Sequence, residues 1–202
     1  MGERALLVTF AEEIDSRANE RARALADAWE AQRIGPAIPA YASTLLHYDP
    51  LRLDASRAEA LARRLVAGRA HVRAGGRLIE IPVRYDGPDL EEVARLSSLE
   101  VTELVSLHAG REYCAYFLGF MPGFAYLGEL DERIVAPRLA SPRTRVPPGA
   151  LAVAGRQTAV YPLASPGGWR LIGSTDAVLF DPRREPPALI GEGDRVRFVP
   201  AQ

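Results

Sequence analysis

Residues 117–128 read FLGFMPGFAYLG, and two related strings follow: APRLASPRTRVPPG over residues 136–149 and AGRQTAVYPLASPGGWRLIGST over residues 154–175. Glycine or proline interrupts each apolar run after a few residues, which is typical of turns between short strands and not of helices. The charge of this segment is also uneven, because residues 133–175 contain six arginines and no Asp or Glu. A turn-rich segment with this charge predicts a site for an anionic ligand that carries a carboxylate or a phosphate.

Short strands are predicted throughout this half of the chain. Their spacing, with a turn signal between successive strands, indicates a β-barrel or a β-sandwich. The expected strands are Tyr113–Leu118, Ala150–Ala154, Ala159–Leu163, Arg170–Gly173, Val178–Phe180 and Arg195–Val199.

The first half of the chain has the pattern of a small α/β unit. Asp15 is the expected N-cap of a first helix, and Ser56 with Glu59 forms the capping box of a second helix that ends at Gly68. The expected strands of this unit are Ala5–Phe10, Tyr41–Tyr48 and Arg77–Tyr85. The predicted fold class is therefore α+β, with a small α/β domain over residues 1–85 and a β-barrel domain over residues 86–202.

A helix pair opens the second predicted domain, one helix starting at Pro88 and the other covering Glu100–His108. The pair resembles a helix-turn-helix, but residues 88–108 carry five acidic residues against the single base Arg95. A surface of this sign does not suit a nucleic acid, so we expect a structural connector.

The composition is that of a soluble globular protein, with 202 residues, 48% of them hydrophobic and 25% charged. No apolar run approaches the roughly 20 residues that span a bilayer, and no leader pattern precedes the first strand, so a cytoplasmic protein without membrane contact is expected. The single cysteine, Cys114, makes no internal disulfide, and His47, His71 and His108 follow no metal-ligand spacing. All 25 basic residues are arginine, which excludes a P-loop lysine and a Schiff-base lysine in this chain.

Several specific strings occur in an order that resembles a known family. They are Gly119-Phe120-x-Pro122-Gly123-Phe124-x-Tyr126-Leu127-Gly128, Pro142-Arg143-Thr144-Arg145-Val146-Pro147, Ala154-Gly155-x-Gln157-Thr158 and Ser165-Pro166-Gly167-Gly168-Trp169. The chain is similar, over nearly its whole length, to subunit 1 of the allophanate hydrolase type, the KipI family, whose bacterial members include the PxpB type of 5-oxoprolinase subunit. It departs from the family pattern at Met121, Ala125, Ala159 and residues 174–176, which leaves the substrate open.

The resemblance implies a cyclophilin-like barrel and a role as one subunit of a heteromeric, ATP-dependent 5-oxoprolinase. It implies a partner similar to allophanate hydrolase subunit 2 (KipA type), and a third subunit of the LamB/YcsF type. ATP is then a cofactor of the assembled complex, and no metal is inferred. The alternatives are an accessory subunit in a urea carboxylase or allophanate hydrolase pathway, and an inhibitor of a histidine kinase.

The candidate catalytic residues are Arg143, Arg145 and Gln157. Alternate positions of an extended segment lie on one face, and a guanidinium binds a carboxylate or phosphoryl group through two parallel bonds. Surface arginines on a loop explain the same pair, and Gln157 fits a turn as well as a ligand. The expected substrate-binding residues, whose glycines and aromatic rings also suit tight turns and a barrel core, are Phe120, Pro122, Gly123, Tyr126, Thr158, Ser165, Gly167, Gly168 and Trp169.

Overall fold

The computed structural model describes residues 4–68 and 76–201. The chain divides into two compact units, unit 1 over Met1–Ala74 and unit 2 over Gly75–Gln202. Each unit has a hydrophobic core of its own, centred on Trp29 and Leu46 in unit 1 and on a larger set of barrel residues in unit 2.

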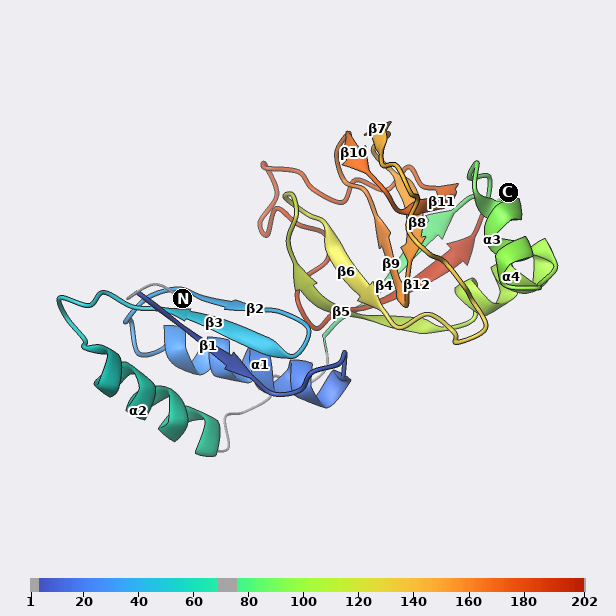
Figure 1. Cartoon of the computed structure of the whole chain (residues 1–202). Coiled ribbons are helices and arrows are strands. Elements are labelled where there is room, and N and C mark those ends of the chain that lie inside the picture. The colour runs from blue at the N-terminus through green and yellow to red at the C-terminus, as the bar shows by residue number, and fades with distance from the viewer. Residues whose placement is uncertain (1–3, 69–75, 202) are drawn as a thin grey trace. The chain divides into compact units, whose positions relative to one another are not determined.

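Unit 1 is a three-stranded antiparallel sheet with two helices on one of its faces (Figure 1). The sheet has the order β1-β3-β2, so that β1 and β2 are its edges. Trp29 of α1 is fully buried and donates from its indole N–H to the carbonyl of His47, 3.0 Å away. The elements are β1 (Ala5–Thr9), α1 (Ser16–Glu30), β2 (Ala37–Pro39), β3 (Ser43–His47) and α2 (Ala55–Ala67).

Both helices of unit 1 begin at an aspartate that caps the first turn. Asp15 accepts a hydrogen bond from the backbone N–H of Ala18 at 2.6 Å, as predicted. The predicted capping box of the second helix is wrong, because Asp54 holds the N-cap position and accepts from the N–H of Arg57 at 2.9 Å. The helix therefore begins two residues earlier in the chain, with an aspartate satisfying the orphan N–H group of its first turn.

Unit 2 is a seven-stranded sheet, curved into a barrel, in the order β11-β8-β9-β6-β5-β12-β4 (Figure 1). Its two edge strands meet where Arg84 and Ser174 exchange two backbone hydrogen bonds of 2.8 Å, so the barrel is nearly closed. The predicted α+β class with a barrel is thereby confirmed. The strands of this sheet are β4 (Leu78–Val83), β5 (Glu112–Leu118), β6 (Ala125–Gly128), β8 (Ala150–Ala154), β9 (Gln157–Val160), β11 (Arg170–Ser174) and β12 (Arg195–Pro200).

The strand β4 belongs to unit 2, whereas the sequence analysis assigned it to the N-terminal domain. It pairs in parallel with β12 from Leu78–Arg195 to Val83–Pro200, more than a hundred residues apart in the chain. The boundary therefore lies at residues 74 and 75 and not at 85 and 86. Local periodicity identifies a strand but does not identify its partner, which explains the misplacement.

Two helices and a small hairpin complete unit 2. The helices α3 (Leu90–Leu96) and α4 (Val101–Ala109) contact β11 and β12 respectively. The strands β7 (Arg143–Val146) and β10 (Ser165–Gly167) form a separate antiparallel pair that sequence analysis did not predict. The predicted strand Val178–Phe180 is only an isolated bridge between Phe180 and Ala188.

Candidate functional site

Unit 2 contains an aromatic pocket of about 300 Å³. We call it the aromatic pocket, defined by Phe120, Phe124, Tyr126, Arg138, Pro142, Tyr161, Pro166, Gly167, Gly168 and Trp169. These residues come from the segments that contain the glycine- and proline-rich strings, so the fold brings the turns of those strings to one place.

The rings of the pocket hold one another edge to face. Phe124 is almost fully buried, and its ring centroid lies 5.3 Å from that of Tyr161 and 5.8 Å from that of Trp169, at steep interplanar angles. Such T-shaped contacts fix the planes of large side chains beyond what burial alone provides. Phe120 differs from the others, since it has a φ of 69° and leaves 61% of its surface exposed. The result is a rigid aromatic wall with one accessible ring.

Arg138 is the only cation among the residues that line the pocket. Its guanidinium carbon lies 6.0 Å from the ring centroid of Trp169, at the outer limit of a cation–π contact. The backbone on both sides of Arg138 is fixed, because the N–H of Leu139 donates to the carbonyl of Gly168 at 2.8 Å and the Nε of Arg170 donates to the carbonyl of Pro137 at 2.9 Å. The exposed side chain therefore extends from an anchored backbone.

Arg170, which anchors Pro137, is itself buried. Its Nη1 lies 2.7 Å from Oε2 of Glu92, an ion pair bent too far for a hydrogen bond. The carboxylate comes from α3, so the segment that carries Arg138 is held through Arg170 to the helix layer of unit 2.

The charge of Arg138 acts on the hydroxyl groups of two tyrosines of the pocket, Tyr126 and Tyr161. Burial raises the pKa of Tyr161, and the backbone N–H of Trp169 and the charges of Arg138 and Arg143 oppose that shift. Burial also raises the pKa of Tyr126, against the charge of Arg138. Both phenols are therefore protonated at neutral pH, and each keeps its proton as a hydrogen-bond donor.

Most arginines of unit 2 are neutralised by a carboxylate. Within residues 76–201, every arginine except Arg138, Arg145 and Arg184 has a carboxylate oxygen within 4.0 Å among the described residues. Arg184 donates to the carbonyls of Val178 and Pro187. Arg138 and Arg145 are thus the two arginines of this part of the chain whose guanidinium meets neither a carboxylate nor a carbonyl of the described residues.

Arg143, one of the candidate catalytic residues, is not among the residues that line the pocket. Its Nη2 donates to Oδ1 of Asp89 at 2.7 Å, and the other oxygen of Asp89 accepts from the N–H of Leu171 at 2.6 Å. Asp89 is 5% exposed, so this pair ties β7 and β11 to the start of α3. The neighbouring candidate Arg145 is exposed on β7 and lies outside the pocket lining.

The structure places five of the predicted substrate-binding residues in the pocket lining: Phe120, Tyr126, Gly167, Gly168 and Trp169. Gly167 is required there, because a Cβ at this position would overlap the hydroxyl of Tyr161. The remaining predicted substrate-binding residues lie outside the lining, as does the candidate catalytic residue Gln157; they are Pro122, Gly123, Thr158 and Ser165.

Two of these residues have a structural task in the barrel. Thr158 is fully buried, donates to the carbonyl of Ala152 at 3.1 Å and lies 2.9 Å from Nε2 of His108. Gly123 has a φ of +79°, and an added Cβ would come within 2.7 Å of the Cβ of Phe180. The buried hydroxyl and the glycine thus both serve packing in the structure, and a role of either residue in ligand binding stays a prediction.

Sequence reasoning missed Arg138 and Tyr161. Arg138 belongs to the same acid-free segment as Arg143 and Arg145, but it has no alternating partner, so the pattern used for the pair did not select it. Tyr161 lies within the expected strand Ala159–Leu163, so its sequence context is that of the barrel core. The sequence did contain a signal for Arg138, because it lies in an acid-free stretch that also contains the string Gly167-Gly168-Trp169.

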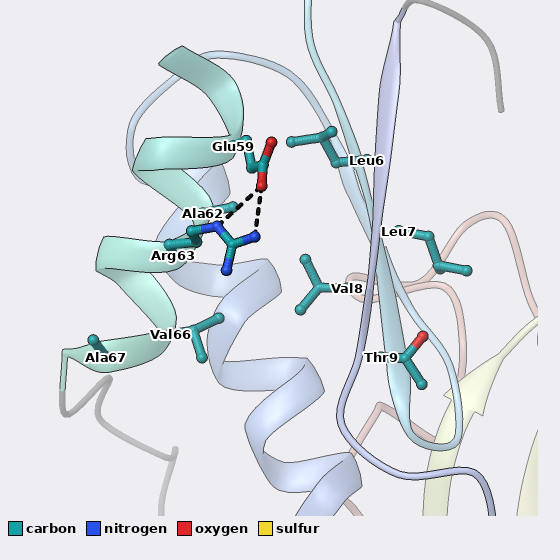
Figure 2. Close-up of a pocket in the computed structure, with 9 residues that line it drawn as sticks. All are labelled: Leu6, Leu7, Val8, Thr9, Glu59, Ala62, Arg63, Val66 and Ala67. Atoms are coloured by element: carbon teal, nitrogen blue, oxygen red, sulfur yellow. Dashed lines mark hydrogen bonds and ion pairs between the residues drawn. The ribbon is translucent and has the colours of Figure 1, made fainter. Parts of the chain in front are cut away.

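Unit 1 has a hollow of a different kind, a groove of about 530 Å³ between the edge strand β1 and α2. Figure 2 shows Leu6 and Val8 on the side of β1 that faces α2, and Val66 across from them. The charged residues of the groove, Glu59 and Arg63, neutralise each other through hydrogen bonds of 2.6 and 3.0 Å. The groove is apolar, and both of its charged side chains are paired.

Neither a metal cluster nor a membrane span occurs in the described part of the chain. Among residues 4–68 and 76–201, no group of three or more His, Cys, Asp or Glu side chains has the arrangement of a metal site; His71 lies outside the described residues. No helix within the same ranges is long and apolar enough to span a bilayer.

The sequence of the chain matches one protein family over nearly its whole length. The sequence profile of the carboxyltransferase domain, subdomain C and D, matches residues 1–190, and the chain belongs to that family. The curated relatives include the 5-oxoprolinase subunit designated B of Bacillus subtilis (strain 168), which is 40% identical over 98% of this chain and 90% of its own length. The resemblance stated from the sequence motifs is thereby confirmed.

Solved structures agree with this relation. The crystal structure of TTHA0988 superposes with a TM-score of 0.88 and 44% identity over 98% of this chain. The chain spans 40% of the length of TTHA0988, so it corresponds to one part of that protein. The Kluyveromyces lactis urea carboxylase matches 98% of this chain and 21% of its own with a TM-score of 0.78 at 18% identity, which shows a common fold alone.

Proposed function

We propose that this chain is a subunit of a heteromeric, ATP-dependent 5-oxoprolinase, which converts 5-oxo-L-proline to L-glutamate. The observation that carries the proposal is the 40% identity to a named 5-oxoprolinase subunit over almost the whole of both chains. The aromatic pocket supports it, because its apolar rings suit the methylene edge of a small lactam and its hydroxyl groups suit polar substituents.

The reaction explains why one subunit is insufficient. An unstrained lactam does not open to completion without an energy source, and hydrolysis of ATP to ADP and phosphate supplies it by activating the lactam oxygen. Catalysis of phosphoryl transfer consists mainly of positioning and charge stabilisation. This chain has no lysine for a P-loop, so we assign most of the nucleotide site to a partner subunit.

Arg145 remains our candidate for contact with the nucleotide or with the activated substrate in the assembled enzyme. It is exposed on β7, and no carboxylate of the described residues lies within 4.0 Å of it. Arg145→Ala should lower kcat/KM of the complex about tenfold while the complex still assembles, and Arg145→Lys should restore only part of the rate. Lost assembly in Arg145→Ala would place the residue at a subunit interface instead.

We assign the main partner as a protein similar to allophanate hydrolase subunit 2, with a third subunit of the LamB/YcsF type completing the enzyme. Unit 2 exposes several large apolar side chains that a partner would cover, namely Phe120, Val135, Leu163 and Val178. Exposed apolar residues of this kind are typical of interaction surfaces when they gather in one region.

The test is to co-express the chain with candidate partner subunits and to assay the purified complex for glutamate and ADP formed from 5-oxoproline and ATP. We expect both products in equal amounts from the complex and neither from the isolated chain. A stable complex that leaves 5-oxoproline intact but consumes ATP with urea would favour the alternative, an accessory subunit of a urea carboxylase or allophanate hydrolase pathway. Inhibition of a histidine kinase stays a prediction, and no feature of the described residues favours it.

A further inference from the structure

We infer that Arg138 is the residue that binds the carboxylate of the small cyclic ligand, with the Tyr161 hydroxyl as the adjacent hydrogen-bond donor. This inference rests on the proposed function for the identity of the lactam, and it adds a binding residue and the ligand group that this residue recognises. Nothing in the sequence pattern had selected either side chain.

The distribution of charge in unit 2 singles out Arg138. The acid-free segment places Arg143 and Arg170 near the pocket as well, but Asp89 neutralises the former and Glu92 the latter. Arg138 lines the pocket and has no carboxylate of the described residues within 4.0 Å. A lone positive charge at an aromatic pocket selects a ligand with a single compensating negative charge.

The backbone around Arg138 is already in place for binding. The hydrogen bonds at Pro137 and Leu139 bracket Arg138 on both sides, and the second of them ends on Gly168 of the pocket itself. Only the side chain of Arg138 therefore has to become ordered when a ligand binds. Fixing the backbone in advance reduces the entropy lost on binding, which is the usual advantage of a preorganised site.

The donors around the guanidinium suit a carboxylate. Tyr161 lines the pocket, and burial raises the pKa of its hydroxyl, so the group keeps its proton for an acceptor on the ligand. Arg138 is close enough to act electrostatically on Tyr161 and Tyr126 alike. A carboxylate has two oxygens and accepts from a guanidinium and a phenol at once, whereas an ammonium ligand has no acceptor for either donor.

The composition of the pocket favours a carboxylate over a nucleotide phosphate. A triphosphate carries several negative charges and is usually held by a lysine, by backbone N–H groups at a helix start or by a metal ion. The aromatic pocket offers one guanidinium, no lysine and walls made mainly of aromatic carbon. One cation beside an apolar wall matches a monocarboxylate with an apolar ring.

The fluorescence of Trp169 provides a local measurement on the full-length chain. The other tryptophan, Trp29, lies in unit 1, and Trp29→Phe leaves Trp169 as the single reporter. The probes are 5-oxoproline, the neutral lactam 2-pyrrolidone, which lacks the carboxylate, and ATP. Because Arg138 is exposed and its charge is screened by water, we expect the wild-type residue to favour 5-oxoproline over 2-pyrrolidone by about five- to tenfold, somewhat below the range for charge-assisted bonds.

Arg138→Gln should reduce this preference to less than about twofold by weakening 5-oxoproline binding and leaving 2-pyrrolidone binding unchanged, and Arg138→Lys should retain part of it. Arg183→Gln is the matched control, since Arg183 is an exposed arginine of unit 2 paired with Asp181 outside the pocket. The inference is overturned if Arg138→Gln keeps the wild-type preference for 5-oxoproline over 2-pyrrolidone. It is also overturned if the wild-type chain binds neither lactam, or binds both equally well. Tighter binding of ATP than of 5-oxoproline that depends on Arg138 also overturns it, in favour of a phosphate.

The outcome separates this inference from the proposed function. A chain that binds 5-oxoproline through Arg138, but whose assembled complex forms no glutamate, retains the carboxylate site and loses the proposed activity. An active 5-oxoprolinase complex in which Arg138→Gln has wild-type KM for 5-oxoproline retains the activity and loses the carboxylate site.

Discussion

The groove of unit 1 is larger than the aromatic pocket of unit 2, but only the pocket has an arginine without a carboxylate partner among the described residues. The groove encloses about 530 Å³ and the pocket about 300 Å³. Yet the two charged side chains of the groove, Glu59 and Arg63, satisfy each other, while Arg138 in the pocket meets no carboxylate of the described residues. A ligand gains little by entering a site whose charges are already paired.

The state of the charges, more than the volume, therefore identifies the site. An exposed arginine without a carboxylate partner keeps its charge available to an anionic ligand, whereas a paired arginine must first give up its partner. The apolar groove beside an edge strand serves packing or contact with another chain equally well, and nothing in its lining distinguishes these.

The two tryptophans turn this comparison into measurements, since Trp29 reports on unit 1 and Trp169 on unit 2. When denaturant unfolding is monitored by the fluorescence of each tryptophan, units that unfold independently give separate transition midpoints. Coincident transitions in every variant would show that the units fold as one, and would remove the basis for treating them separately.

The largest effect on stability is expected for Asp89→Ala. The change leaves Arg143 without its carboxylate and the N–H of Leu171 without its acceptor. Breaking a buried ion pair from one side typically costs about 3–5 kcal/mol, and because the Arg143 side chain is 27% exposed we expect the lower end, about 3 kcal/mol. The Trp169 transition should shift to lower denaturant, and the Trp29 transition should stay in place.

The control for that variant is Asp181→Ala, which removes an ion pair whose arginine, Arg183, is 88% exposed. A surface pair contributes about 0–1 kcal/mol, so its effect should be small. Equal effects of the two substitutions would mean that the Asp89–Arg143 pair is not the tie between α3 and the barrel that its geometry indicates.

This pair also shows where sequence reasoning stops. The acid-free segment was visible, and so was the recurrence of arginine in it, but whether a given arginine is paired depends on α3, some fifty residues earlier in the chain. The strands with a continuous or alternating apolar pattern, such as β8 and β12, were predicted from the local sequence. The strands β6, β7 and β10 were missed because glycine and proline, which read as turn signals, lie within or beside them.

The second effect is a loss of stability of unit 2 in acid, caused by His108. Its Nε2–H donates to Thr158, which itself donates to Ala152, so its Nδ1 accepts from the hydroxyl of Tyr85 and the ring is neutral. Burial, and to a lesser extent the charge of Arg111, lowers the pKa of His108 from 6.5 to about 3. As the pH falls from 6.5 towards 3, the His108 imidazole is protonated in the unfolded chain but stays neutral in the folded chain, which favours unfolding.

The contribution of His108 to the free energy of unfolding is fully present above a pH of about 6.5 and declines below it. The loss from this single site is about 2 kcal/mol at a pH of about 5. The Trp169 transition should show that decline. His108→Gln should lower the stability of unit 2 at neutral pH but remove this part of the pH dependence. An unchanged pH dependence in His108→Gln would mean that other groups cause the acid sensitivity.

The third effect concerns ligand binding and comes from Gly167→Ala. The added methyl group would overlap the hydroxyl of Tyr161 and force that ring to move, in a pocket whose rings are fixed by edge-to-face contacts. We expect 5-oxoproline binding, followed by Trp169 fluorescence, to weaken by about tenfold, which corresponds to about 1.4 kcal/mol. Gly68→Ala in unit 1, where an added Cβ meets only ordinary contacts of 3.5 Å, is the control and should bind as the wild type does.

The smallest effect on binding is expected for Val66→Ser, which places a hydroxyl in the groove of unit 1 (Figure 2). Val66 is partly buried against the unit 1 core, so the substitution should shift the Trp29 transition by about 1 kcal/mol through lost apolar burial. Binding of 5-oxoproline should change by less than about twofold, since the groove offers no unpaired donor to a carboxylate. If Val66→Ser weakens 5-oxoproline binding more than Arg138→Gln does, the larger hollow is the ligand site, and unpaired charge does not mark the site in this protein.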